Sequence, residues 1–304
     1  PILFIHGGPG AHVREIDREF FKSFTSQGFD VYLYDQPGGG FSNEIPLSEC
    51  TMERYIDDIE LIRKKIKASK IILVGQSFGG NICSTYTSKY PKNVKSIIFS
   101  APGELRPKTL KEINKDKRKL EDSGIQFATE KIEKFEPPFN EAIRFATAVL
   151  MCKYGGRDTV EKLITQKEMT EYATRAIPEA IHMAYHVKYI NQVPKIKSGG
   201  LNVLVNASVH DNYQKICQKV IENIKQVDVP VLVLRAEYDY VDWEATKYYD
   251  SIYRNSYLVY ISESGHIPWS INTEDTYKAM SCFLSEEYNS LNVYKGNIDP
   301  RLVN

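Results

Sequence analysis

The chain has 304 residues, of which 42% are hydrophobic and 26% are charged, values typical of a globular protein and not of a disordered or fibrous one. Its 39 lysines and arginines equal its 39 aspartates and glutamates, so no net charge favours nucleic acid or an anionic membrane. The five cysteines are scattered without C-x-x-C spacing, which argues for free thiols in a reducing compartment. No apolar run approaches the roughly 18 residues of a membrane-spanning helix. We therefore predict a cytoplasmic protein without nucleic-acid or membrane partners, and leave its oligomeric state open.

The chain begins directly in an apolar strand at residues 2–5, so we expect that an upstream segment is missing from this sequence. The strand runs into His6-Gly7-Gly8-Pro9-Gly10, whose glycines and proline are incompatible with helix or strand. Two interpretations fit this loop: an ordinary tight turn, or a backbone that approaches a ligand closely.

An amphipathic helix is predicted over 13–27, ended by Gly28. The next strand, 29–34, leads into a second glycine-rich loop at 35–42. Asp35 opens this loop, and we interpret its carboxylate as structural, accepting hydrogen bonds from nearby backbone N–H groups.

A helix from Thr51, its N-cap, to about residue 68 precedes the apolar strand 71–74. This strand enters Gly75-Gln76-Ser77-Phe78-Gly79, and a helix follows over 80–90. In a G-x-S-x-G elbow the turn lifts the serine hydroxyl above the sheet edge and directs helix N–H groups towards it. The flanking glycines are expected because the turn leaves no room for Cβ atoms. Another strand, 94–100, continues the alternation, which indicates a parallel sheet with crossover helices.

From about residue 102 to 226 the alternation stops, and only helical segments rich in charge and tyrosine are recognisable. We interpret 103–227 as a mainly helical cap inserted into a core made of 1–102 and 228–304.

Three features of this insertion have two readings each. Residues 106–119 contain seven basic residues and form either a solvated helix or, less plausibly, an anion-attracting rim. His182 and His186 are spaced for one helix face, but zinc would need further ligands, so packing or surface roles are favoured. Leu201 to Val205 is predicted as a short strand or a buried turn.

Strand and helix then alternate again to the end of the core. The predicted elements are a strand at 229–234 with its loop 235–242, a helix from about Trp243, a strand at 256–261 with its loop 262–269, and a helix at about 271–289.

Three side chains suited to nucleophilic catalysis follow predicted strands directly. Ser77, Asp239 and His266 therefore fall on the same edge of a parallel sheet, in the chain order associated with this elbow. A hydroxyl is a poor nucleophile without an adjacent base, and the base needs a group that fixes its tautomer. Glu237 and Asp242 lie on the same loop as Asp239 and are the alternative acids.

The two glycine-containing turns predict an oxyanion hole. The N–H of Phe78, next to the serine, would act together with an N–H of the first loop, from Gly8 or Gly7.

The sequence resembles the α/β-hydrolase superfamily and, within it, the prolyl-iminopeptidase-like serine hydrolases of peptidase family S33. The resemblance covers about 1–102 and 228–289 and implies an α/β-hydrolase fold, with a mostly parallel sheet, helices on both faces and an inserted helical cap. The shared motifs are H-G-G-P-G at 6–10, D-Q-P-G-G-G-F-S at 35–42, G-Q-S-F-G-G at 75–80, Tyr238-Asp239 and Gly265-His266.

The resemblance implies acyl transfer to water, in which Ser77 attacks, His266 is the base and Asp239 orients it. It implies no metal or organic cofactor, and a short peptide with a free N-terminus as substrate. A small-molecule carboxylester or amide would be served by the same groups, and a ligand receptor that keeps the three residues is a further alternative.

Several residues depart from the family pattern. Pro37 replaces the usual arginine of the second loop, and Gln76 and Phe78 replace the glycine and tryptophan common at the elbow of prolyl iminopeptidases.

Substrate-binding candidates follow from the same resemblance. Those enzymes hold an α-ammonium group with carboxylates, for which Glu104 and Glu237 are candidates. Aromatic walls of a proline pocket would come from Phe41, Phe78 and Trp269, which core packing would explain as well.

Overall fold

The computed structural model describes most of the chain, namely residues 1–106, 137–154, 156–176 and 200–302. His182, His186 and all of the basic stretch 106–119 except Arg106 lie outside these described residues.

Six strands form one parallel sheet in the order β2-β1-β3-β4-β5-β6 in the part of the chain that is described. The strand order reverses at β1, because β2 lies on one side of it and β3 on the other. Open parallel sheets bind ligands at the carboxyl ends of the strands beside such a reversal. The strands are β1 (Ile2–Ile5), β2 (Val31–Leu33), β3 (Ile71–Gln76), β4 (Val94–Ser100), β5 (Val231–Ala236) and β6 (Ser256–Ile261).

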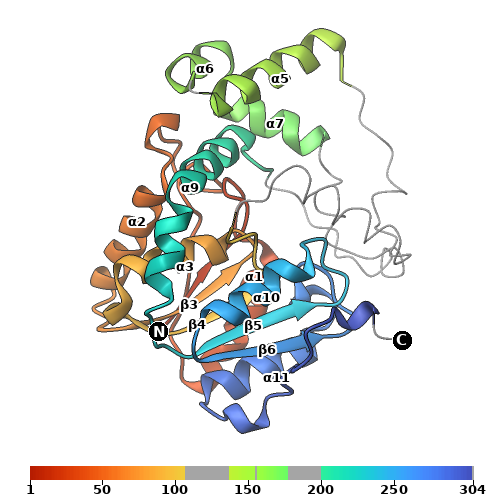
Figure 1. The fold of residues 1–304 in the computed structure, drawn as a ribbon. Helices are drawn as coiled ribbons and strands as arrows, with labels where there is room; N and C mark the ends of the chain where they lie inside the picture. The colour runs from red at the N-terminus through yellow and green to blue at the C-terminus, as the bar shows by residue number, and fades with distance from the viewer. Residues whose placement is uncertain (107–136, 155, 177–199, 303–304) are drawn as a thin grey trace.

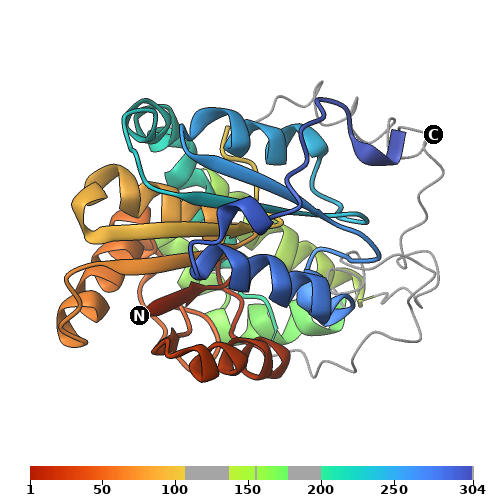
Figure 2. The same cartoon turned by 90° about the horizontal axis from the view of Figure 1, so that it is seen from below.

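Helices cover both faces of the sheet, because successive strand residues point to opposite sides. Leu3 and Ile5 pack with α2, α3, α9 and α10, whereas Ile2 and Phe4 pack with α1 and α11. Figure 2 shows α10 on one side of the sheet and α1 with α11 on the other. These helices are α1 (Glu15–Lys22), α2 (Met52–Lys65), α3 (Gly79–Lys89), α9 (Val203–Ile224), α10 (Trp243–Ile252) and α11 (Thr273–Leu284).

Most predicted elements of the core are confirmed. The bounds of β4 and β6 are those expected from the sequence, and the Thr51 hydroxyl caps α2 by accepting a hydrogen bond from the N–H of Arg54 at 3.2 Å. The predicted helix 13–27 is an α-helix continued by a 3₁₀ turn, Ser23–Gln27, which ends at Gly28 with φ +84°.

Three helices lie on the far side of α9 from the sheet, at the top of Figure 1. They are α5 (Phe139–Lys153), α6 (Arg157–Leu163) and α7 (Gln166–Ala176). Helix α9 contacts α5 and α7 at one end and α2 and α3 on the sheet, so it connects these helices to the core. The boundaries of core and cap remain a prediction.

The prediction of a strand or turn at 201–205 is wrong, because α9 begins at Val203. Asn202 is its N-cap, and its Oδ1 accepts a hydrogen bond from the N–H of Val205 at 3.2 Å. The β-branched valines suggested a strand, but Leu204, Val205 and Val209 are buried together in the main core cluster. Tertiary burial therefore overrides the local preference for strand.

No helix within the described ranges is long and apolar enough to cross a membrane. All five cysteines are free, and four of them are buried.

Candidate active site

Ser77 occupies the sharp turn between β3 and α3. Its φ is +54°, a left-handed conformation that costs a non-glycine residue free energy and must be held by its surroundings. Its N–H donates to the carbonyl of Ser100 at 3.1 Å, and its carbonyl accepts from the N–H groups of Gly80 and Gly103, both at 2.9 Å. The serine backbone is thus fixed on both sides.

The two glycines of the elbow are required by close packing, as the sequence predicted. A Cβ on Gly75 would lie 2.6 Å from the carbonyl oxygen of Gly79, and one on Gly79 would lie 2.1 Å from that of Ile5. Both distances are shorter than any normal carbon–oxygen contact, so the helix can start this close to β1 only without side chains there.

The structure brings Asp239 and His266 together. Asp239 follows β5, His266 follows β6, and Nδ1 of the imidazole lies 2.7 Å from Oδ1 of the carboxylate, with both side chains buried. The N–H of Val241 donates to the same Oδ1 at 3.0 Å. Of the alternative acids, Glu237 instead accepts a hydrogen bond from the N–H of Glu263 at 2.6 Å.

A buried cation, Arg235, faces the other oxygen of Asp239. Its Nη1 lies 3.6 Å from Oδ2, and both side chains have 0% exposure. Burial alone would raise the pKa of Asp239, but the charge and hydrogen bond of His266, followed by the charge of Arg235, outweigh it, so the pKa is lowered. The carboxylate therefore stays ionised. Sequence reasoning missed Arg235, although an arginine directly after four apolar strand residues was a visible signal.

Tyr240 contacts both the base and the nucleophile. Its ring centroid lies 4.3 Å from that of His266. Burial raises the pKa of its phenol to about 12, an effect that a hydrogen bond with the Ser77 side chain partly opposes. A neutral hydroxyl is thus held against Ser77 at ordinary pH, a contact that no sequence pattern indicated.

The H-G-G-P-G loop lies directly against the elbow. A Cβ on Gly7 would be 2.7 Å from the Cβ of Ser77. The imidazole of His6 is neutral, because burial lowers its pKa to about 4. Its Nδ1–H donates to the carbonyl of Gly7 at 2.7 Å, and its Nε2 accepts from the N–H of Gln36 at 3.1 Å. The loop after β1 and the loop after β2 are therefore tied together next to the serine.

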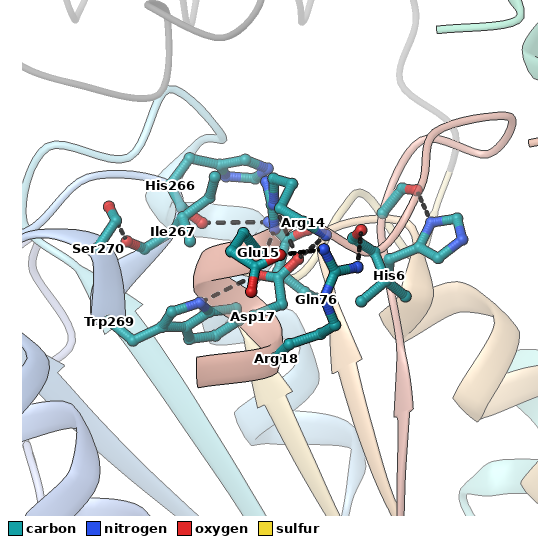
Figure 3. Close-up of polar contacts among 12 residues, drawn as sticks. His6, Arg14, Glu15, Asp17, Arg18, Gln76, His266, Ile267, Trp269 and Ser270 are labelled. Carbon is teal, nitrogen blue, oxygen red and sulfur yellow. Dashed lines mark hydrogen bonds and ion pairs between the residues drawn. The ribbon is translucent and has the colours of Figure 1, made fainter. Parts of the chain in front are cut away.

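Gln76 ties the elbow to the loop that carries the base. Its Nε2 donates to the carbonyl of His266 at 3.2 Å, as Figure 3 shows. Gln76, one of the three residues that depart from the resemblance described above, thus bonds to the backbone of His266.

Asp35 has the structural role that the sequence predicted. Its two oxygens accept hydrogen bonds from the N–H groups of Val13, at 2.6 Å, and Phe41, at 2.9 Å.

The predicted substrate-binding residues are dispersed. Trp269 is 1% exposed, and its indole N–H donates to Asp17 at 3.0 Å in the core on the α1 side (Figure 3). This placement does not fit an aromatic wall beside Ser77. The Phe41 ring is 96% exposed, and Glu104 is half-buried on the loop after β4, where its carbonyl accepts from Asn81 at 2.7 Å.

The Phe78 ring, the third aromatic candidate, is buried against His210 and Tyr213, with centroid distances of 4.3 and 5.8 Å. Among all the residues that the structure describes, no group of three or more His, Cys, Asp or Glu side chains is arranged to hold a metal ion.

Parts of this chain are similar in sequence to known proteins. A family model described as alpha/beta hydrolase fold matches residues 1–138. A proline iminopeptidase of Flavobacterium johnsoniae is 36% identical over 102 residues, which are 33% of this chain and 34% of that protein. A proline iminopeptidase of Saccharolobus solfataricus is 24% identical over 97% of this chain and 87% of its own length.

Among solved structures, a thermophilic esterase from Thermogutta terrifontis superposes with a TM-score of 0.60 at 20% identity, covering 95% of this chain and 90% of the esterase. This likeness concerns the fold.

Proposed function

We propose that this chain, an enzyme with the α/β-hydrolase fold, is a serine hydrolase that transfers an acyl group from its substrate to water through Ser77. The observation that carries the proposal is the buried pair of Asp239 and His266, 2.7 Å apart, on the loops that follow β5 and β6. The elbow that carries Ser77 lies on the same sheet, and Gln76 beside it bonds to His266.

In the first half-reaction of the proposed mechanism, each of these groups has a role. The Ser77 oxygen attacks the substrate carbonyl while Nε2 of His266 accepts its proton, and Asp239 holds Nδ1–H and stabilises the imidazolium. The N–H of Phe78 and one from Gly7 or Gly8 donate to the oxyanion. Collapse of the tetrahedral intermediate forms the acyl-enzyme, and His266 protonates the departing amine or alcohol.

The second half-reaction repeats the first with water. His266 takes a proton from water, which attacks the ester carbon, and returns it to Ser77 as the acid departs. The resting enzyme is thereby restored.

Our first choice of substrate is a short peptide with a free N-terminus, from which the first residue is released. The relatives named proline iminopeptidase support this choice. Glu104 is the candidate carboxylate for the α-ammonium group, because it follows Gly103, whose backbone bonds to Ser77. Glu237 is the second candidate, and its carboxylate accepts a hydrogen bond from the N–H of Glu263 on the neighbouring loop.

The second candidate is a small-molecule carboxylester or amide hydrolase. The likeness of the fold to an esterase over nearly the whole chain favours it. No step of the mechanism above needs an amine on the substrate.

Hydrolysis of a substrate panel by wild type and Ser77→Ala tests the proposal. The panel contains prolyl, alanyl and leucyl naphthylamides, the same compounds with blocked amines, and short acyl esters. We expect turnover by wild type that falls by at least about 10³-fold in Ser77→Ala, and loss of naphthylamide turnover when the amine is blocked.

Turnover of the esters alone would contradict the peptidase proposal and favour the second candidate, a carboxylester hydrolase. Turnover that survives in Ser77→Ala would contradict the proposed mechanism.

A further inference from the structure

The start of helix α9 lies on both glycine-rich loops. The backbone N–H of Asn202 donates to the carbonyl of Gly10 at 2.9 Å, and its side-chain amide donates to the carbonyl of Gly38 at 3.1 Å. A Cβ on Gly10 would lie only 2.6 Å from the carbonyl oxygen of Asn202. Helix and loop are therefore in direct backbone contact.

One turn further along, Asn206 contacts the loop nearer to Ser77. Its Nδ2 donates to the carbonyl of Gly8 at 2.8 Å and to that of Pro9 at 3.1 Å. Gly8 has φ +118°, a backbone conformation that glycine adopts far more readily than other residues. Because one amide nitrogen donates to two successive carbonyls, it holds the Gly8–Pro9 and Pro9–Gly10 peptide groups in place.

His210, one turn beyond Asn206, completes the contact. Its ring centroid lies 4.3 Å from that of Phe78. Burial lowers the pKa of the imidazole, and hydrogen bonding to the Gly8 backbone partly opposes this shift. Residues four apart share one face of a helix. From this face of α9, Asn206 contacts the H-G-G-P-G loop and His210 contacts Phe78, so α9 touches both proposed sources of oxyanion donors.

We infer that Asn206 and His210 are positioning residues of the oxyanion hole: they hold the carbonyl of Gly8 and thereby the backbone of this loop, so that an N–H of Gly7 or Gly8 points to the developing oxyanion. This inference rests on the proposed function. Donors stabilise a transition state most when they are already oriented before the reaction. Here the orientation comes from a helix that also contacts α5 and α7.

If Asn206 and His210 had only a structural role, their substitution would lower the stability of the protein without specifically weakening binding of the transition state. Asn212 provides the matched control, because it lies on the same helix and its Oδ1 accepts a hydrogen bond from the N–H of Met52 at 2.9 Å, on a different segment from the Gly8 loop. His210→Phe keeps an aromatic ring against Phe78 and removes only the hydrogen bond, so it serves if Asn206→Ala fails to fold.

The experiment compares Asn206→Ala, His210→Phe and Asn212→Ala with wild type, on the best substrate of the panel. It measures kcat, KM, Tm and the Kd of a trifluoromethyl ketone analogue, which forms a tetrahedral oxyanion on the serine. We expect kcat to fall about 10- to 100-fold in Asn206→Ala and His210→Phe, with KM within about twofold and the ketone Kd weakened in parallel with kcat. Asn212→Ala should keep kcat and ketone affinity.

Wild-type kcat and ketone affinity in Asn206→Ala and His210→Phe would overturn the inference, as would equal losses in Asn212→Ala. Those outcomes leave the proposed function intact, whereas turnover independent of Ser77 overturns the proposed function itself.

Discussion

The carboxylate of Asp239 is surrounded by groups that keep it ionised and oriented. His266 and the N–H of Val241 bond to one oxygen, and the buried Arg235 faces the other. Burying a charge without partners would cost several kcal/mol of folding free energy. These contacts offset that cost, so the carboxylate stays ionised next to the imidazole. The position of this carboxylate is thus set by the core and does not depend on substrate.

Asp239→Asn tests this arrangement. The amide cannot hold the imidazole in the same tautomer, so we expect kcat to fall by about 10⁴-fold. Glu237→Gln is the matched control when both variants are assayed on an acyl ester without an α-ammonium group: the amide oxygen can still accept from Glu263, and activity should stay within a few-fold of wild type. Both are measured by kcat/KM together with Tm. Loss of activity in Glu237→Gln with retention in Asp239→Asn would reassign the acid.

At this scale the sequence predicts that Asp239 and His266 meet, because each follows a strand of one parallel sheet, and their side chains lie 2.7 Å apart. Ser77 was grouped with them on the same ground. Sequence reasoning fails where the direction of a side chain decides. Tyr240 could not be assigned, since only the folded loop turns its ring towards His266. For Trp269 the sequence left a pocket wall and core packing open, and its ring lies in the core.

The elbow shows why β3 and α3 need glycine at two positions. Helix α3 approaches β1 so closely that the position of Gly79 has no space for a methyl group, with Ile5 only 2.1 Å from the place of its Cβ. This close approach places the first N–H groups of the helix beside Ser77, where a developing negative charge is stabilised.

Gly79→Ala should therefore destabilise the protein strongly, by at least about 3 kcal/mol, and lower activity with it. Gly28→Ala is the control, because no atom lies within 4 Å of its missing Cβ and only its φ of +84° is unfavourable. We expect that variant to lose about 1–2 kcal/mol and keep wild-type kcat. Urea unfolding gives both values. A Gly79→Ala protein as stable as Gly28→Ala would contradict the packing described here.

Among the elements, buried strands were predicted best and the start of α9 worst. Four or more apolar residues between turn signals mark β3 to β6 unambiguously, since both faces of these strands are covered. The first residues of α9 carry the same β-branched composition. Their burial between the sheet and the outer helices, together with the N-cap formed by Asn202, selects the helix.

In the whole molecule, the loops of the core form the candidate active site, and the outer helices α5 and α7 are connected to the core through α9. Equal numbers of basic and acidic residues give no long-range field to attract a charged partner, which agrees with a small substrate recognised by local contacts. The same three residues can cleave an ester or an amide, so the substrate could not be derived from the motifs that identify the fold.

Covalent labelling by a fluorophosphonate, read by intact mass and peptide mapping, tests the central claim most directly. The reagent reacts with a serine only when a neighbouring base and an oxyanion hole activate it. We predict one adduct, on Ser77, that is absent in Ser77→Ala and forms at least about 10³-fold more slowly in His266→Ala. An adduct on another residue, or equal labelling of wild type and His266→Ala, would contradict the account of Ser77 as an activated nucleophile.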